Sequence, residues 1–124
     1  MTNSRAKGAR GEREWAKVLT RMGFPARRGQ QFAGGPDSPD VVCESLKHIL
    51  FECKVGSRQY INFGATLDKA FEQARADCGT KRPVVVWRNA RGPWVMSWED
   101  DGIECHVVGE YMIGKVLAKW KEQP

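Results

Sequence analysis

Two charged side chains interrupt an otherwise apolar run at residues 49–55, which has the sequence Ile-Leu-Phe-Glu-Cys-Lys-Val. Aromatic and branched residues of this kind favour an extended strand, in which successive side chains point to opposite faces. Glu52 and Lys54 therefore project together from one face, and the other face is apolar and able to pack against a helix: Phe51, Cys53 and Val55. A Glu–Lys pair on an exposed sheet face is commonly structural, so its surroundings decide what it means.

A further carboxylate, Asp40, stands between Pro39 and the strand-like run Val41-Val-Cys43. Proline supplies no backbone N–H and marks the entry to a strand. The polar residues 44–48 predict a hairpin that pairs 40–43 with 49–54 and places Asp40 beside Glu52. Two carboxylates held in a partly buried site repel one another, and a hard divalent cation, Mg²⁺ first, relieves that repulsion.

A third carboxylate, Glu12, belongs to an amphipathic helix predicted over about 8–22 and ended by Gly23. Glu12 borders the core-facing stripe of this helix and is expected to reach the same metal, directly or through water. The alternative is a first-turn glutamate favoured by the helix dipole. The core-facing stripe follows helical spacing: Trp15, Val18, Leu19 and Met22.

The later patterns complete an α/β order. A second helix covers about 67–74, with Thr66 as its expected N-cap, and a third lies near 113–120. Strands are expected at 84–87 and 94–98, and Trp94 and Trp98 are candidates for an interface between two copies. This order predicts an α/β fold with a mixed central β-sheet flanked by helices. A length of 124 residues predicts one domain over 1–124.

The positive charge is unevenly distributed. Residues 1–28 contain eight basic and two acidic side chains, whereas the remainder has twelve basic and thirteen acidic ones. A basic end on a nearly neutral body indicates a polyanionic partner, because clustered Lys and Arg release phosphate counterions when they bind. A solvated helix face is the plainer interpretation of the same charges.

Several classes of protein are not expected. The chain has no apolar run of transmembrane length, and no apolar segment follows its charged N-terminus, so we expect a cytoplasmic protein without a membrane partner. The cysteines lack a C-x-x-C pair, which disfavours a metal–thiolate site, and Cys43 and Cys53 are expected to be small buried hydrophobes. No small-molecule cofactor is indicated.

Two motifs resemble a known family. Pro39-Asp40, followed after eleven residues by Glu52-Cys53-Lys54, resembles the PD-(D/E)XK nuclease signature. Gly8-Ala-Arg-Gly-Glu12-Arg13 is similar to the N-terminal helix motif of the archaeal-type (Hjc-like) Holliday junction resolvases and their phage relatives. The likeness covers about residues 5–55 well and the second helix weakly. It implies a restriction-endonuclease-like core.

The resemblance also implies a homodimeric, Mg²⁺-dependent endodeoxyribonuclease that resolves four-way DNA junctions by paired symmetric nicks, with Mn²⁺ as a substitute. Asp40 and Glu52 would hold the metal, and Glu12 would complete the acidic site. Lys54 would orient the attacking water and stabilise charge on the phosphate. Asp40 is preferred to Asp37 because a strand-like run follows it directly.

Eight residues are expected to contact the branched double-stranded DNA: Arg10, Arg13, Arg27, Arg28, Gln30, Gln31, Arg58 and Tyr60. Gln30 or Gln31 stands in the loop where the family has a serine, and Lys17 extends the basic surface. Gln73 lies on the edge of the second helix, and a similar glutamine recurs near the site of some related nucleases. A surface glutamine is the alternative.

Two other functions remain open at this stage. One is a repair, restriction-like or flap-cutting nuclease on the same PD-(D/E)XK scaffold, with the same chemistry and a different DNA-binding surface. The other is a non-catalytic DNA-binding module whose acidic cluster is structural.

Overall fold

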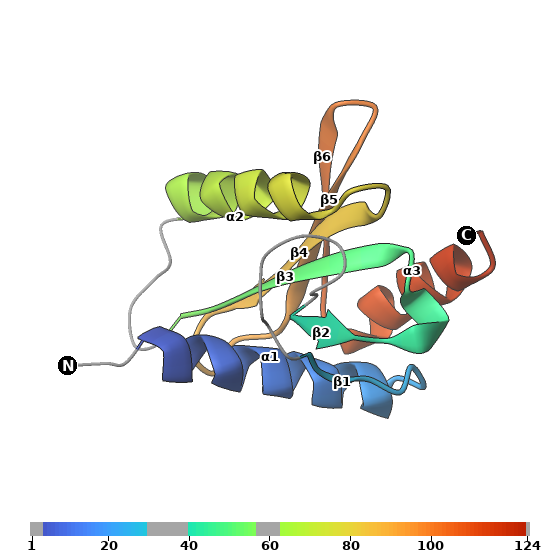
Figure 1. Ribbon diagram of the computed structural model, residues 1–124, viewed down its shortest axis with the longest axis horizontal. Helices are drawn as coiled ribbons and strands as arrows, with labels where there is room; N and C mark the ends of the chain where they lie inside the picture. The colour runs from blue at the N-terminus through green and yellow to red at the C-terminus, as the bar shows by residue number, and fades with distance from the viewer. Residues whose placement is uncertain (1–3, 30–39, 57–62, 124) are drawn as a thin grey trace.

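The computed structural model describes residues 4–29, 40–56 and 63–123. Helices and strands alternate along these residues (Figure 1). Their order is α1 Ser4–Arg21, β1 Arg27–Arg28, β2 Val41–Val42, the 3-10 helix η1 Glu44–Leu46, β3 Ile49–Val55, α2 Phe63–Asp77, β4 Arg82–Arg88, β5 Val95–Asp100, β6 Ile103–Val108 and α3 Glu110–Lys121. None of the described helices combines the length and the apolarity needed to cross a membrane.

Four strands form the central sheet in the order β3-β4-β5-β6. Strands β3 and β4 run parallel and pair along the whole of β3, whereas β4–β5 and β5–β6 are antiparallel. The parallel pair is joined by α2, as a parallel connection requires a crossover. The predicted mixed sheet flanked by helices is therefore confirmed.

The predicted hairpin between 40–43 and 49–54 is wrong. Strand β2 pairs instead with β1 in a separate antiparallel sheet, with Arg28 opposite Val41. The intervening residues form η1, which turns the chain away from hairpin pairing. Strand β3 then takes β4 as its partner, and it stands at the edge of the four-stranded sheet.

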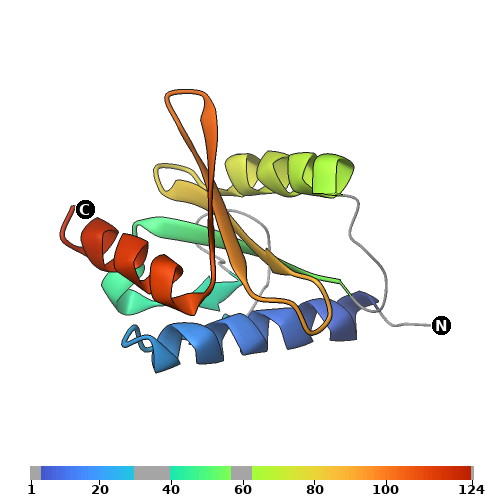
Figure 2. The same ribbon diagram turned by 180° about the vertical axis from the view of Figure 1, so that it is seen from behind.

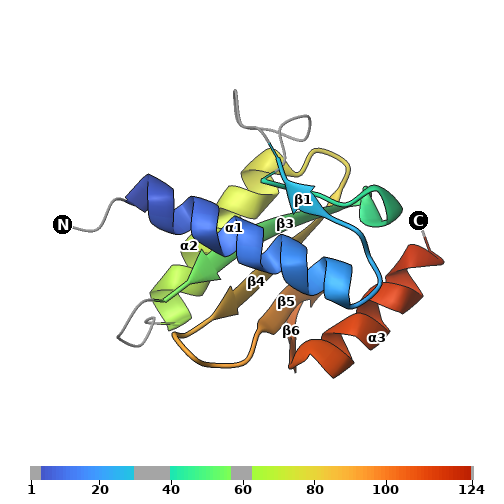
Figure 3. The same cartoon turned by 90° about the horizontal axis from the view of Figure 1, so that it is seen from below.

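Helices cover both faces of the central sheet. Helices α1 and α3 lie on one face and α2 lies on the other, as Figures 1 and 3 show from two directions. On the α1 face, Trp15 packs against Phe51 and Trp94, with ring centroids 5.5 and 5.0 Å apart. On the α2 face, Phe71 packs against Val85. The alternation predicted for β3 is confirmed, because its odd-numbered residues from Phe51 onward join the α1-side core.

The ends of two helices test the expected caps. Gly23 has a φ of +99°, and the Phe24 N–H donates to the carbonyl of Leu19 at 2.8 Å, so the glycine ends α1 as predicted. Helix α2 begins at Phe63, so Thr66 lies inside it and is not its N-cap. Gly64 lies between the first residue of α2 and Thr66. A glycine lowers helix stability by about 1 kcal/mol, which is too little to stop a helix that packs against the sheet.

The interface expected at Trp94 and Trp98 is also contradicted. Trp94, directly before β5, is only 7% exposed and Trp98, within β5, only 9%, because β5 is an inner strand covered by helices on this face. Trp98 packs edge-on against Trp120 of α3, with centroids 5.0 Å apart. Strand β6 was not predicted; a two-residue Asp101-Gly102 turn, with φ of +50° and +76°, connects it to β5 (Figure 2).

The two glycines of the first helix provide a matched test of this packing. An added Cβ at Gly11 would meet Cγ2 of Val55 at 3.0 Å, whereas one at Gly8 would meet nothing within 4 Å. Gly8→Ala is therefore expected to raise the free energy of unfolding by about 0.5–1 kcal/mol. The free energy of unfolding of Gly11→Ala is expected to be at least about 1 kcal/mol lower than that of Gly8→Ala, because the added methyl group would crowd Val55 and push α1 away from β3. Urea unfolding measures both, and equal stabilities would contradict the close approach.

Candidate active site

Glu52 is a buried carboxylate on the face of β3 that is turned toward α2. Its residue is 8% exposed, and Nζ of Lys54 lies 3.4 Å from its Oε1. Leu50, two residues earlier on the same face, packs against Ala74 of α2 and against Cys78, which follows the end of that helix. Burial raises the pKa of Glu52, and the ammonium of Lys54 offsets part of that rise. The strand thus holds one costly negative charge and one cation side by side.

Asp40 stands directly before β2, where its backbone is held in place. Its carbonyl accepts a hydrogen bond from the Gly29 N–H at 2.7 Å, next to the β1–β2 ladder. The pKa of Asp40 is raised from 3.8 to about 7, first by burial and then by the negative charges of Glu52 and Glu12. In the absence of a cation, this carboxyl is therefore close to half protonated at neutral pH.

Glu12 brings a third carboxylate from α1. Its side chain is 13% exposed, and its Oε2 accepts a hydrogen bond from Nε of Arg28 at 2.8 Å. Its negative charge raises the pKa of both Asp40 and Glu52. The charges of Glu12 on α1, Asp40 directly before β2 and Glu52 on β3 therefore influence one another, although β2 and β3 do not form a hairpin.

Asp77 is a fourth carboxylate at this position, and sequence reasoning missed it. It ends α2 and accepts a hydrogen bond from Nε2 of Gln73 at 2.6 Å. The last turn of α2 rests on Leu50, so Asp77 approaches β3 on the face that carries Glu52. Its charge raises the pKa of Asp40 and of Glu52. The only signal was its neighbour Gln73, which contacts Asp77 in the structure.

The donor set fits a hard divalent cation. Carboxylate oxygens are the ligands that Mg²⁺ prefers, and burial, the largest cause of the raised pKa values of Asp40 and Glu52, makes their negative charges costly without a cation. Within the described residues, no three Asp, Glu, His or Cys side chains are grouped closely enough to hold an ion by themselves. Mg²⁺ keeps several of its waters and is commonly bound by one or two carboxylates, so a Mg²⁺ site does not require three side chains.

The cysteines take no part in this chemistry. All four are free, and Cys53 points to the α1-side core, where burial raises the pKa of its thiol well above the ordinary value. A neutral, buried thiol is neither a nucleophile nor a metal ligand. Cys43 is buried, as the sequence predicts, whereas Cys53 is only partly buried and packs against the edge of the core.

The basic residues expected to contact DNA fall into two groups. Arg10, Arg13, Arg27 and Arg28 are exposed, and the last three line a groove between α1 and β1. The groove has a volume of about 440 Å³. The other predicted contacts, together with Asp37, lie outside the described residues: Gln30, Gln31, Arg58 and Tyr60.

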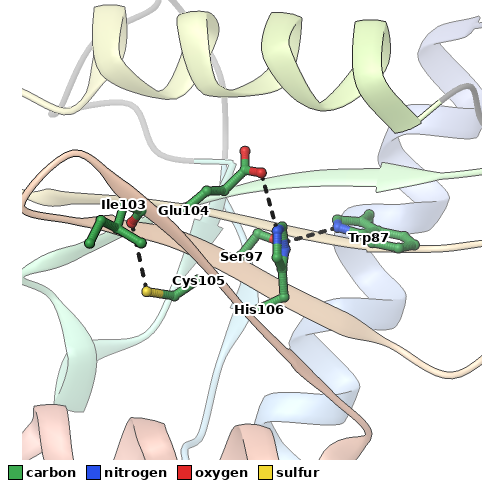
Figure 4. A network of polar contacts seen from close by, with 6 residues as sticks. All are labelled: Trp87, Ser97, Ile103, Glu104, Cys105 and His106. Carbon is green, nitrogen blue, oxygen red and sulfur yellow. Dashed lines mark hydrogen bonds and ion pairs between the residues drawn. The ribbon is translucent and has the colours of Figure 1, made fainter.

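A second polar cluster crosses β4, β5 and β6 (Figure 4). The carboxylate of Glu104 only accepts, so His106 donates from Nε2 at 3.2 Å and accepts from the Ser97 hydroxyl at 2.6 Å through Nδ1. Ser97 in turn accepts from the indole N–H of Trp87 at 3.2 Å. This Ser–His–Glu order has the residue types of a hydrolase triad, but Ser97 is 0% exposed and its oxygen cannot reach a substrate.

Removing the Asp40 charge is expected to stabilise the chain in a pH-dependent way. Folding raises the pKa of this carboxyl from 3.8 to about 7. The contribution of Asp40 to the free energy of unfolding is therefore greatest below pH 3.8 and falls as the pH rises toward 7. In EDTA, Asp40→Asn should therefore raise the free energy of unfolding by about 1–2 kcal/mol at pH 8, after allowance for solvent screening, and by little at pH 4.

Denaturant unfolding at several pH values measures this difference. Asp101→Asn, at an exposed turn position whose left-handed backbone asparagine tolerates, is the matched control and should give the same small change at each pH. An equal gain for Asp40→Asn at pH 4 and pH 8 would contradict the site's electrostatics.

A comparison with protein-family models adds independent evidence. The model described as archaeal Holliday junction resolvase (Hjc) matches residues 3–119, which include α1 and every strand of both sheets. No curated protein shows significant similarity to the chain. The match spans nearly the whole sequence and includes Glu12, Asp40, Glu52 and Lys54. The chain therefore belongs to the Hjc family of Holliday junction resolvases, which has the PD-(D/E)XK fold.

Proposed function

We propose that this chain is a Mg²⁺-dependent endodeoxyribonuclease that resolves four-way DNA junctions by paired symmetric nicks, with Mn²⁺ as a substitute for Mg²⁺. The observation that carries the proposal is the carboxyl of Asp40, whose pKa is raised to about 7 first by burial and then by the negative charges of Glu52 and Glu12. Such a set lacks positive charge in the free chain and gains it from a divalent cation. With DNA as substrate, the cytoplasm is the expected location, that of the host if the chain is phage-encoded.

Each side chain has a defined task in this proposal. Asp40 and Glu52 hold the ion, and Glu12 completes the acidic site. The bound cation lowers the pKa of a water and neutralises charge on the scissile phosphate. Lys54, fixed by its 3.4 Å contact with Glu52, orients the attacking water and stabilises the charge that develops on the phosphate oxygens.

The basic surface beside the site holds the DNA backbone. Arg10, Arg13, Arg27 and Arg28 are exposed guanidinium groups, which bind phosphate through planar, paired N–H groups. We expect Gln30, Gln31, Arg58 and Tyr60 to extend this surface. These contacts position the junction and do not read its bases, which agrees with a nuclease selective for DNA shape.

Paired nicking requires two acidic sites, which a two-fold homodimer supplies. The structure exposes apolar side chains around the end of β6 and the start of α3: Val108 is 56%, Tyr111 73% and Met112 45% exposed. Exposed apolar side chains gathered in this way are typical of protein interfaces. We propose that a second copy of the chain covers them, at the opposite edge of the sheet from β3.

Two carboxylate substitutions test the chemistry. Asp40→Asn and Glu52→Gln are each expected to lower the rate of Mg²⁺-dependent junction cleavage by at least about a hundredfold, because each removes a metal-binding charge while the basic surface remains. The measurement uses a labelled four-way junction, with affinity determined separately in EDTA. Asp101→Asn and Glu44→Gln, at exposed positions, are the matched controls and should cleave at the rate of the unchanged chain.

The substrate set distinguishes the remaining functions. Paired symmetric nicks on junctions, with linear duplex uncut, support the proposal. Cleavage of linear or other branched DNA at the same rate would indicate a repair or restriction-like nuclease on this scaffold. Binding without Mg²⁺-dependent cleavage would overturn the nuclease assignment.

A charge in the exposed apolar cluster tests the dimer. Tyr111→Lys is expected to weaken self-association at least about tenfold, because it places an ammonium in an apolar contact. Sedimentation equilibrium measures the dissociation constant, and Ala76→Lys, at an exposed site on α2, is the control. A chain that is monomeric with and without junction DNA would rule out paired nicking by a dimer.

A further inference from the structure

The groove between α1 and β1 is lined by cations and has no acidic residue in its walls. Helix α1 contributes one wall and the β1 segment the other, and the small side chains of Ala16 and Ala26 keep the floor open. Its remaining lining residues are Arg13, Lys17, Thr20, Arg21, Arg27 and Arg28. The surface inside the groove is mostly apolar, and the basic residues among its lining supply the positive charge that a phosphate backbone requires.

Two of the groove's cations are engaged by carboxylates. Arg21 pairs with Glu110 at 2.7 Å, and Arg28 pairs with Glu12 at 2.8 Å. Within the described ranges, the other three cations have no ion-pair partner and supply the free positive charge of the groove: Arg13, Lys17 and Arg27. Of the two paired cations, only Arg28 connects the groove with a member of the acidic site.

The geometry of Arg28 allows it to serve both sides. Its Nε donates to Glu12, so its two terminal Nη groups remain available to a phosphate in the groove. Its side chain is 41% exposed, whereas that of Glu12 is only 13% exposed. Arg28 is therefore more accessible to an anion from solvent than Glu12 is.

We propose that DNA backbone bound in the α1–β1 groove is coupled to metal binding at the acidic site through the Arg28–Glu12 ion pair. In the free chain, the guanidinium cancels part of the Glu12 charge that Asp40 and Glu52 experience. A phosphate bound to Nη of Arg28 offsets the charge of the guanidinium, so the negative charge of Glu12 attracts the metal ion more strongly. This proposal rests on the proposed function and makes Arg28 a positioning residue for Glu12.

Coupling of this kind is reciprocal. If groove occupation tightens metal binding, metal binding tightens the hold on DNA by the same factor. A partly exposed ion pair supports a modest effect, and we expect about three- to tenfold. The practical result is an acidic site that binds its ion best once a DNA arm is already seated.

The first experiment needs no DNA. Mn²⁺ affinity is measured by calorimetry for the unchanged chain, Arg28→Gln, Glu12→Gln and the double variant. Arg28→Gln should bind Mn²⁺ about three- to tenfold more tightly, and the same change should have no effect in the Glu12→Gln background. Arg75→Gln, which breaks the exposed Arg75–Glu99 pair, is the control and should leave the affinity unchanged.

A conservative variant separates charge from folding. Arg28→Lys keeps the positive charge and should bind Mn²⁺ as the unchanged chain does, and thermal unfolding of every variant checks that each is folded. Unchanged or weaker Mn²⁺ binding by folded Arg28→Gln would overturn the proposal. If Arg28→Gln does not fold, Arg28→Met replaces it as the uncharged variant. Equal Mn²⁺ affinities for folded Arg28→Lys and Arg28→Met would then overturn the proposal.

The second experiment measures the reciprocal effect. Junction affinity is determined by fluorescence anisotropy in EDTA and in Mn²⁺, in a Lys54→Met background that prevents cleavage. Arg28→Gln should reduce the gain from Mn²⁺ by about three- to tenfold, whereas Arg27→Gln should weaken binding equally in both conditions. Equal gains for the two variants would show that Arg28 is a phosphate contact only.

The two proposals fail separately. Cleavage of junctions together with additive Arg28 and Glu12 effects on Mn²⁺ would remove the coupling and leave the nuclease. The opposite result is a chain that cleaves no DNA but in which the Arg28 and Glu12 substitutions have non-additive effects on Mn²⁺ affinity. It would support the coupling between Arg28 and the acidic site and contradict the proposed reaction.

Discussion

The rest of the structure depends on one buried carboxylate, that of Glu52, which its position on β3 keeps away from water. Glu52 is 8% exposed because β3 pairs with β4 along its full length and α2 covers the face on which the side chain lies. A buried charge of this kind is costly unless cations balance it. Lys54 supplies one such charge, and the other carboxylates increase the deficit. A bound divalent cation, as proposed above, would offset this cost.

The acidic site and the basic groove share their supporting elements. Helix α1 carries Glu12 toward β3 and also forms a wall of the groove, and β1 pairs with the strand that follows Asp40. Membership of the Hjc family supplies the junction as the substrate class for these two surfaces. A single unit made of α1, β1 and β2 thus places phosphate-binding groups and carboxylates next to one another, and Arg28 belongs to both.

Local periodicity was enough to predict much of the site. Strand alternation placed Glu52 with Lys54, and helix periodicity placed Glu12 beside the core. The sequence could not give the partner of β2, because pairing with β1 or with β3 depends on contacts far apart in the chain. Asp77 was missed for a similar reason, since its approach to β3 depends on how α2 docks. Strand β6, in contrast, was missed despite a readable signal, the Asp-Gly turn.

The width of the central sheet has a consequence for where two cuts fall. Three strand spacings separate β3 from β6, which amounts to about 14 Å within one copy. Two copies joined through the β6 side, with about 10 Å for the contact layer, hold their acidic groups roughly 35–40 Å apart. That span is close to one full turn of B-form DNA, about 34–36 Å. In the proposed dimer, the separation of the two acidic sites would therefore be fixed by the width of the sheet.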